Sequence, residues 1–169
     1  DRDYVTMPKL LKEKGYYTFS MHGNKADMWN RSKMHPQLGY DELFFKESFN
    51  VTEENTTGLG INDYAFFEQA MPILRKIENN HDNYMGTILT LSNHSPFNDL
   101  KKYGEFDLSY TKKVIDEETN EEKEEKIDYL ADTKMGNYIK SAHYADLALK
   151  EFIEYIKNDE LFEDTIFVF

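Results

Sequence analysis

The 169-residue chain contains no cysteine, which excludes a disulfide framework and any metal site built from thiolates. It also lacks a run of about 18 apolar residues, so the sequence predicts no membrane-spanning helix within it. Positive charge is scarce, because 20 Lys and Arg stand against 32 Asp and Glu, for a formal net charge of -12. A nucleic-acid backbone or an anionic membrane surface is therefore not expected as a partner of the domain as a whole.

Aromatic side chains, in contrast, are abundant. They make up 15% of the chain and indicate an ordered core, even though the mean hydropathy is only -0.74. The length suits one domain with a sizeable core. Seven acidic residues and two lysines lie between residues 116 and 126, in "DEETNEEKEEK". This stretch fits either a solvated hairpin tip or the start of a helix.

Both ends of the chain are unusual for a complete domain. The sequence opens with "DRDYVTMPKL", in which a helix begins almost at once, and it stops at the apolar run "DTIFVF". Domain boundaries usually fall in polar linkers instead. We therefore expect residues 1–169 to be an internal fragment of one larger domain.

Hydrophobic periodicity predicts alternating helices and strands. Thr6, Pro8 and Gly15 mark the start and the stop of a short first helix. The elements expected after it are a strand over 16–22, a helix over 62–80, a strand over 84–92, a helix over 133–157 and a strand over 165–169. Pro72 should bend the second helix or delay its start. Such alternation is typical of an α/β fold with a mainly parallel sheet and helices on both faces.

Ligands of open parallel sheets bind beyond the carboxyl ends of the strands. The first predicted strand ends at His22 and leads into "HGNKADMWNR", and the second ends at Ser92 and leads into "NHSPF". His22 and His94 are therefore expected at one edge of the sheet. One histidine at a strand end is often only a hydrogen-bonding residue, but two in equivalent places favour the wall of a binding site.

The loop after the first strand also carries side chains suited to an anionic small molecule. Arg31 offers a planar fork of donors for a phosphate, sulfate or carboxylate, and Trp29 could wall the pocket. Gly23 would let the backbone turn sharply or approach a ligand closely. In the alternative interpretation, Trp29 anchors the loop in the core and Arg31 pairs with a surface acid. Too few carboxylates and imidazoles cluster here for a complete metal site.

The other three histidines are not assigned to this site. His143 falls within the predicted amphipathic helix over 133–157, where core packing or a buried hydrogen bond is expected. His35 and His81 are expected in surface loops.

Three segments, taken in order, resemble a known family. "HGNKADMWNR" with the later "GYDELFF" is similar to a segment of lipoteichoic acid synthases, the polyglycerol-phosphate polymerases of Gram-positive bacteria. "TLSNHSPF" resembles their asparagine–histidine loop, and "SAHYADLALKEFIEYIKNDELFEDTIFVF" resembles the helix and strand before their final metal-binding motif. The resemblance covers nearly the whole chain and implies an alkaline phosphatase/sulfatase-like fold.

The resemblance further implies an extracellular catalytic domain, tethered to the membrane of a Gram-positive bacterium by upstream helices. A threonine nucleophile would take glycerol-phosphate from phosphatidylglycerol and pass it to a growing lipoteichoic acid-type polymer. The cofactor would be a divalent metal ion, Mn²⁺ or Mg²⁺. The nucleophile and a metal-binding glutamate would lie before Asp1, and an aspartate–histidine metal pair would lie after Phe169.

Carried over position by position, the substrate-binding residues that the resemblance implies are His22, Asn24, Trp29, Arg31 and His94. No catalytic residue and no metal ligand would fall within the chain, so neither turnover nor tight metal binding is expected from these residues alone. Asn24 stands where some relatives have aspartate, and Met28 stands where phenylalanine is common. Both differences bear on which donor is recognised.

Two other functions remain open from the sequence. A sulfatase or a phosphoethanolamine transferase of the same superfamily would share this pattern and would differ in its nucleophile or in its substrate. A non-catalytic domain that only binds glycerol-phosphate polymer or a protein partner would lack the threonine before Asp1. It would also lack the aspartate–histidine pair after Phe169.

Overall fold

A three-stranded parallel sheet lies at the centre of the protein, whose computed structural model describes residues 4–97 and 106–169. The strands, in spatial order, are β2 (Glu42–Phe44), β1 (Tyr17–His22) and β5 (Tyr84–Leu89). Strand β1 pairs with β5 along its whole length, from Tyr17 opposite Tyr84 to His22 opposite Leu89. The predicted parallel sheet is confirmed, with β1 as its central strand.

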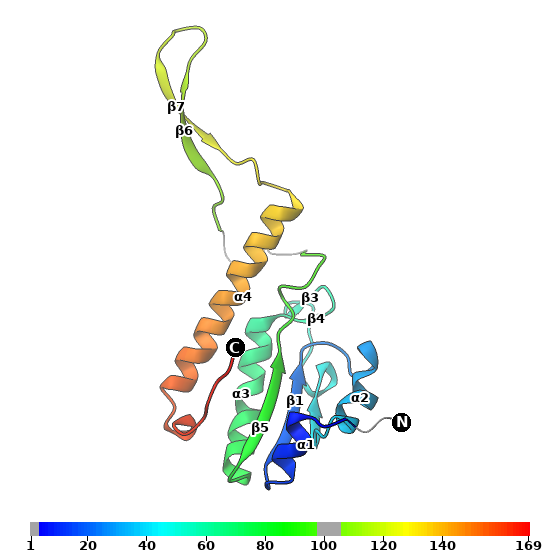
Figure 1. The fold of residues 1–169 in the computed structure, drawn as a ribbon. Helices are drawn as coiled ribbons and strands as arrows, with labels where there is room; N and C mark the ends of the chain where they lie inside the picture. The colour runs from blue at the N-terminus through cyan, green and yellow to red at the C-terminus, as the bar shows by residue number, and fades with distance from the viewer. Residues whose placement is uncertain (1–3, 98–105) are drawn as a thin grey trace.

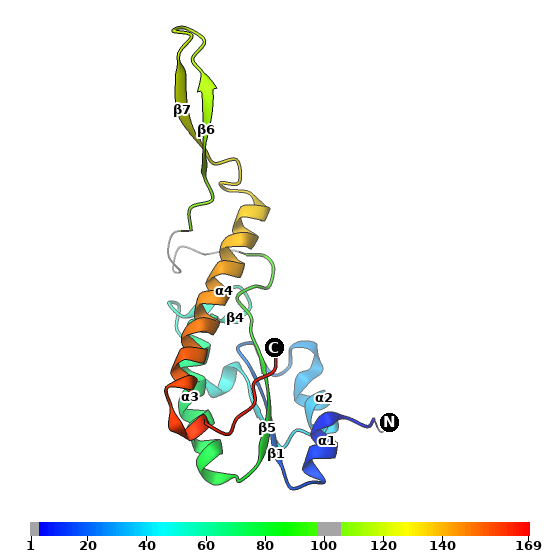
Figure 2. The same ribbon diagram turned by 60° about the vertical axis from the view of Figure 1, so that its left-hand side comes forward.

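Helices cover both faces of this sheet, as Figures 1 and 2 show. Helices α1 and α2 lie on one side, and α3 lies on the other side with the long α4 packed along it. Their bounds are α1 (Met7–Lys12), α2 (Arg31–Gln37), α3 (Asp63–Asn80) and α4 (Lys134–Lys157). None of the helices in the described ranges is long and apolar enough to cross a lipid bilayer.

Short elements connect these layers. Among the residues that the structure describes, three single turns of 3-10 helix and a two-stranded ribbon lie between or after the main elements. They are η1 (Met28–Asn30), η2 (Lys46–Ser48), η4 (Glu160–Phe162), β3 (Thr56–Thr57) and β4 (Gly60–Ile61). The ribbon of β3 and β4 leads directly into α3.

The two long helices begin at side-chain caps. Asn62 Oδ1 accepts the backbone N–H of Ala65 at 3.0 Å, and Thr133 Oγ1 accepts that of Gly136 at 3.0 Å. Each cap satisfies one of the N–H groups that a helix start leaves without an intrahelical partner. The polar residue before each apolar helical pattern therefore fixes where the helix starts.

Pro72 lies inside α3 and not at its start. A proline removes one backbone donor and usually weakens a helix interior. The buried face of α3 compensates, because it carries the apolar residues Phe66, Phe67, Ala70, Met71, Leu74 and Ile77. The prediction that Pro72 delays the start of this helix was wrong.

The two faces of β1 differ in character because successive side chains point to opposite faces of a strand. Phe19 and Met21 are 1% and 0% exposed and join the apolar core formed with α3 and α4. Thr18 and Ser20 are fully buried on the other face, together with His22. One face of β1 thus builds the core, and the other is a buried polar stripe beneath α1 and α2.

The acidic stretch forms the tip and second strand of a hairpin. Strands β6 (Tyr110–Ile115) and β7 (Glu122–Ile127) pair antiparallel and stand away from the sheet in Figure 1. Lys112 lies opposite Glu125 and Lys113 opposite Glu124, so opposite charges face each other across the ribbon. Of the two structures predicted for this stretch, the hairpin is therefore the correct one.

The predicted last strand was wrong. Residues 165–169 form no strand in the described structure, and Ile166, Val168 and Phe169 are 88%, 89% and 84% exposed. The segment is held at its start, where the hydroxyl groups of Thr165 and Tyr84 lie 2.8 Å apart. An apolar run becomes a strand only where its backbone groups find a pairing partner, and here they are not paired in a ladder.

Candidate functional site

The carboxyl ends of β1 and β5 meet at one edge of the sheet, and His22 lies at this edge. Its side chain is 4% exposed, and its Nδ1 lies 2.9 Å from the carbonyl oxygen of Leu89, the residue opposite it on β5. A carbonyl oxygen only accepts, so Nδ1 carries the proton and Nε2 is the acceptor in the neutral ring. The histidine is therefore held in one orientation and one tautomer.

Gly23 lets the backbone after β1 lie very close to the backbone of β4. A Cβ atom added at Gly23 would lie 2.9 Å from the carbonyl oxygen of Ile61, and one at Gly60 would lie 2.2 Å from that of Gly23. The N–H of Ile61 donates to the carbonyl of Gly23 at 3.0 Å. The sequence predicted a sharp turn or a close approach to a ligand at Gly23, and the close approach that the structure shows is instead to the backbone of β4.

Asn24 is buried within the loop, with 2% of its surface exposed. Its Oδ1 accepts the N–H of Lys25 at 2.7 Å, and its carbonyl accepts the N–H of Lys46 at 3.0 Å. Asn24 therefore holds the base of the loop together, directly beside His22. Its predicted contact with substrate stays a prediction.

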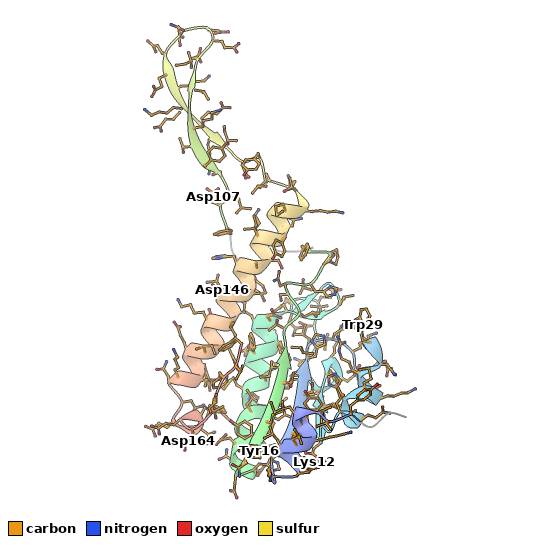
Figure 3. The ribbon with its side chains drawn as sticks, in the orientation of Figure 1. Lys12, Tyr16, Trp29, Asp107, Asp146 and Asp164 are labelled. Atoms are coloured by element: carbon orange, nitrogen blue, oxygen red, sulfur yellow. The ribbon has the colours of Figure 1, made fainter. Side chains whose placement is uncertain are left out.

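Trp29 lies at the exposed end of the same loop, next to α2 (Figure 3). Its side chain is 73% exposed, which excludes the alternative that it anchors the loop in the core. Trp29 and Asn30 both have a φ of 57°, in the left-handed region that residues with side chains rarely adopt. Backbone strain of this kind concentrates at functional sites, and here it presents an aromatic face to solvent.

Arg31 begins α2 and is partly exposed. Its guanidinium donates to the carbonyl of Met28 at 3.1 Å, which directs the side chain back over the loop. It forms no ion pair in the described structure, so the alternative in which it pairs with a surface acid is not observed. Burial lowers the pKa of Arg31, but a guanidinium is so weak an acid that it stays charged at neutral pH.

His94 lies in the loop after β5. A buried carboxylate holds the first residues of this loop in place. Asp63 is fully buried, and its Oδ1 accepts the N–H groups of Leu91 and Ser92 at 2.8 and 3.1 Å. The Ser141 hydroxyl of α4 donates to the carbonyl of Ser92. Residues of both α3 and α4 thus hold the start of the loop. The exposed His94 follows directly after this fixed segment.

His22 at the end of β1 has two neighbours placed by geometry, since His35 of α2 bonds to Ser20 on the same face of β1 and Arg31 lies four residues before His35 on that helix. Burial lowers the pKa of His22 most, the hydrogen bond to the Leu89 carbonyl opposes the change, and the positive charges of Arg31, His35 and His94 lower it further. The electrostatic effect of Arg31 on His22 agrees with this placement. In the absence of an anion, neutral His22 is favoured beside a charged Arg31.

His35 is one of these neighbours, although the sequence placed it in a surface loop. It lies on α2 and is half-buried, with its Nδ1 3.0 Å from the hydroxyl of Ser20. The error arose because α2 was not predicted within the polar loop. Its position four residues after Arg31, on one helical face, is the signal that could have found it.

The other two histidines lie outside the site. The ring of His81 stacks on Tyr17 at 3.9 Å, at the opposite end of β1. The ring of His143 stacks on Phe106 at 4.1 Å, which agrees with a packing role. His81 is half-buried and not a free surface residue, so its predicted setting was only partly right.

Within residues 4–97 and 106–169, no three His, Asp or Glu side chains come together in a way that could hold a metal ion. Asp63, the buried carboxylate nearest the site, already binds two backbone N–H groups through one oxygen. The described side chains of this edge suit an anion better than a cation. A divalent metal bound by residues outside the chain stays a prediction.

The parallel sheet with helices on both faces is an α/β fold of the sulfatase type. A family model described as Sulfatase matches residues 1–169. The chain belongs to the sulfatase family, and the predicted sulfatase-like α/β architecture is confirmed.

Within that family the chain is similar to lipoteichoic acid synthases. It is 30% identical to lipoteichoic acid synthase 2 of Bacillus subtilis over 163 residues, which is 96% of this chain and 22% of that protein. It superposes on the crystal structure of the lipoteichoic acid synthase LtaP from Listeria monocytogenes with a TM-score of 0.79 and 30% identity, covering 97% of this chain and 35% of the other. The predicted resemblance is therefore confirmed.

A more distant structural likeness shows the fold alone. Streptococcus pyogenes phosphoglycerol transferase GacH, in complex with sn-glycerol-1-phosphate, matches with a TM-score of 0.53 and 18% identity, over 86% of this chain and 34% of that one. The chain thus spans about a fifth of the Bacillus relative's length and about a third of each of the two solved chains.

Proposed function

We propose that this chain forms the glycerol-phosphate-binding part of a phosphoglycerol transferase. The complete enzyme would act on the extracellular face of the membrane of a Gram-positive bacterium, tethered by helices outside this chain. It would move glycerol-phosphate from phosphatidylglycerol to a lipoteichoic acid-type polymer. The observation that carries the proposal is the position of His22 at the carboxyl end of β1, with Arg31 at the start of α2 and α2 bonded to the same face of β1 through His35 and Ser20.

Arg31 is the main phosphate ligand in this proposal. A guanidinium binds phosphate oxygens through parallel N–H donors, and charge-assisted bonds of this kind are about twice as strong as neutral ones. The guanidinium is partly buried, which lowers its hydration and strengthens its attraction to an anion. Because its charge is fixed, it supports phosphate binding throughout the physiological pH range.

The two histidines of the strand ends would complete the site. Nε2 of His22 can accept a hydrogen bond from a glycerol hydroxyl while neutral, and can donate to a phosphate oxygen once protonated. An anion beside Arg31 favours this protonation, because it offsets the positive charges that disfavour it. His94 would approach from the other loop, and Trp29 would supply an apolar wall for the glycerol chain.

The metal and the nucleophile are assigned to residues outside the chain. When bound, a divalent Mn²⁺ or Mg²⁺ ion would activate the threonine nucleophile and polarise the phosphoryl group. The residues of this chain would then bind the glycerol-phosphate and orient it for attack. The names of relatives support the glycerol-phosphate polymer as the substrate class, since they are lipoteichoic acid synthases.

The test is transfer by the full-length protein and its Arg31→Ala variant, with fluorescent phosphatidylglycerol in vesicles and Mn²⁺ present. We expect the variant to release no diacylglycerol above background while unfolding at the same temperature as the parent. Lys33→Ala is the matched control, because Lys33 is an exposed cation two residues further along α2. Undiminished transfer by Arg31→Ala would exclude the proposal.

An aryl sulfate assay with the same preparations distinguishes the second function that the family allows. Sulfate and phosphate are both tetrahedral oxyanions, so Arg31 could bind either. Hydrolysis of the aryl sulfate without release of diacylglycerol would assign the protein as a sulfatase. Release of diacylglycerol with inert aryl sulfate would support the transferase.

A further inference from the structure

Helix α2 places two side chains toward the site from one face. Arg31 is its first residue and His35 follows four positions later, so the two lie one above the other on the helix. The rotation of α2 about its axis therefore determines where both side chains point. Whatever fixes His35 also limits the position of Arg31.

His35 is fixed by the buried polar stripe of β1. Its Nδ1 lies 3.0 Å from Ser20 Oγ, and Ser20 is 0% exposed. Its ring also packs at 5.3 Å from the ring of Tyr40 and at 5.6 Å, edge to face, from that of Phe45. Of the hydrogen bonds made by α2 side chains in the described structure, the bond to Ser20 is the one that reaches the sheet.

Ser20 and His22 share one face of β1, because they are two residues apart on a strand. The bond from His35 to Ser20 therefore lies directly behind His22. The charge of Arg31 lowers the pKa of both His35 and His22. The bond of His35 to Ser20 and the spacing of Arg31 and His35 on α2 therefore link this helix to the strand that ends at His22.

We propose that His35 is a positioning residue whose hydrogen bond to Ser20 locks α2 on the sheet and so aims Arg31 at the phosphate beyond β1. This inference rests on the proposed function, because it assigns the binding of phosphate to the same edge. A loose α2 would let the guanidinium swing away from the site, and the ligand would then have to stop this motion on binding. His35 would therefore act on affinity without touching the ligand.

The experiment measures binding of sn-glycerol-1-phosphate to the full-length protein by isothermal titration calorimetry. His35→Ala should weaken binding about tenfold, the factor expected when one hydrogen bond no longer holds the site. His35→Asn should bind within about threefold of the parent, because the Asn amide takes the place of Nδ1. Ser20→Ala should weaken binding as much as His35→Ala, and the double variant should be no weaker than either single one.

His81→Ala is the matched control. This half-buried histidine packs on Tyr17 at the far end of β1, so its removal can lower stability but should leave the dissociation constant unchanged. If His81→Ala weakens binding equally, general loosening explains the result and the inference is wrong. The inference also fails if His35→Ala binds like the parent, or if His35→Asn binds as weakly as His35→Ala.

The outcomes separate this inference from the proposed function. Binding that Arg31→Ala abolishes but His35→Ala and Ser20→Ala leave intact overturns the positioning role alone. A parent protein that does not bind sn-glycerol-1-phosphate, or an Arg31→Ala variant that binds as tightly as the parent, overturns both. Should His35→Ala fail to fold, Ser20→Ala and His35→Asn still decide the question.

Discussion

The two faces of β1 illustrate how one strand serves both stability and binding. Phe19 and Met21 face the helices α3 and α4 and are buried among apolar side chains, whereas Ser20 and His22 face α2 and are buried among polar ones. The apolar face gains stability from the area that it removes from water. The polar face gains little net stability, but its hydrogen bonds fix the orientation of the side chains beyond it.

This difference predicts that substitutions on the two faces have separate effects. Met21→Ala in the full-length protein should lose about 2–5 kcal/mol of unfolding free energy, the usual cost of truncating a buried methionine. The folded protein should still bind sn-glycerol-1-phosphate with the parent affinity. Urea unfolding and calorimetry measure the two quantities, with Ser20→Ala as the counterpart on the other face. Equal losses of stability from both variants would remove the distinction between the faces.

Asp63 is a buried polar group outside β1. Its substitution tests whether such a group affects ligand affinity as well as unfolding free energy. Asp63→Ala leaves the N–H groups of Leu91 and Ser92 without their acceptor and should cost about 1–3 kcal/mol of unfolding free energy. It should also weaken ligand binding, because the loop that carries His94 loses its anchor.

Asp63→Asn is the control for this loop anchor. It keeps an oxygen acceptor for both N–H groups and removes the charge of a carboxylate whose Oδ2 has no hydrogen-bond partner among the described residues. We expect its unfolding free energy and its affinity to stay close to those of the parent. A loss as large as that of Asp63→Ala would show that the charge itself is required.

The polar face should also make stability depend on pH. Burial lowers the pKa of His22 and His35 in the folded protein, and the charge of Arg31 lowers both further. The unfolded state then binds protons more readily, so stability is lost as the pH falls below the unfolded value of about 6.5. The loss is at most about 1.4 kcal/mol per pH unit for each proton.

Thermal unfolding between about pH 7.5 and pH 5.5 measures this effect, and His35→Asn should reduce the slope. Burial raises the pKa of Asp63, and this group acts in the opposite direction, favouring the folded state as the pH falls. The Asp63→Asn variant removes that contribution. An unchanged slope in His35→Asn would show that His35 does not titrate with folding.

The hairpin provides the smallest expected effect. Lys126 and Asp107 form an ion pair at 2.8 Å with both side chains largely exposed, 67% and 63%. Such surface pairs contribute little to stability. Lys126→Ala should therefore leave both the unfolding temperature and the affinity within error of the parent. A measurable change in affinity would show that the hairpin influences ligand binding at the site.

Much of the fold could be predicted from local patterns. Long apolar periodicity located α3 and α4, and the strands β1 and β5 follow from short apolar runs. Strand β2 was missed, because it has only the three residues Glu42–Phe44 and pairs with β1 from within a polar loop. The strand expected at 165–169 failed for the opposite reason, since its residues are apolar but not paired.

The residues of the site that follow directly from the ends of the strands could be predicted from the sequence. The residues that act through tertiary contacts could not. The rule for parallel sheets brought His22 and His94 to one edge without knowledge of the fold. His35 and Asp63 act through contacts with Ser20 and Ser92, which lie 15 and 29 residues away in sequence. No local pattern reports such contacts, so these two residues emerged only from the structure.

A structure of the full-length protein with sn-glycerol-1-phosphate tests the central claim most directly. The account predicts phosphate oxygens within hydrogen-bonding distance of the Arg31 guanidinium, with the ring of His22 or His94 in contact with the ligand. It also predicts that the bond between His35 and Ser20 is retained. A phosphate bound away from the carboxyl ends of β1 and β5, with Arg31 pointing to solvent, would contradict the account.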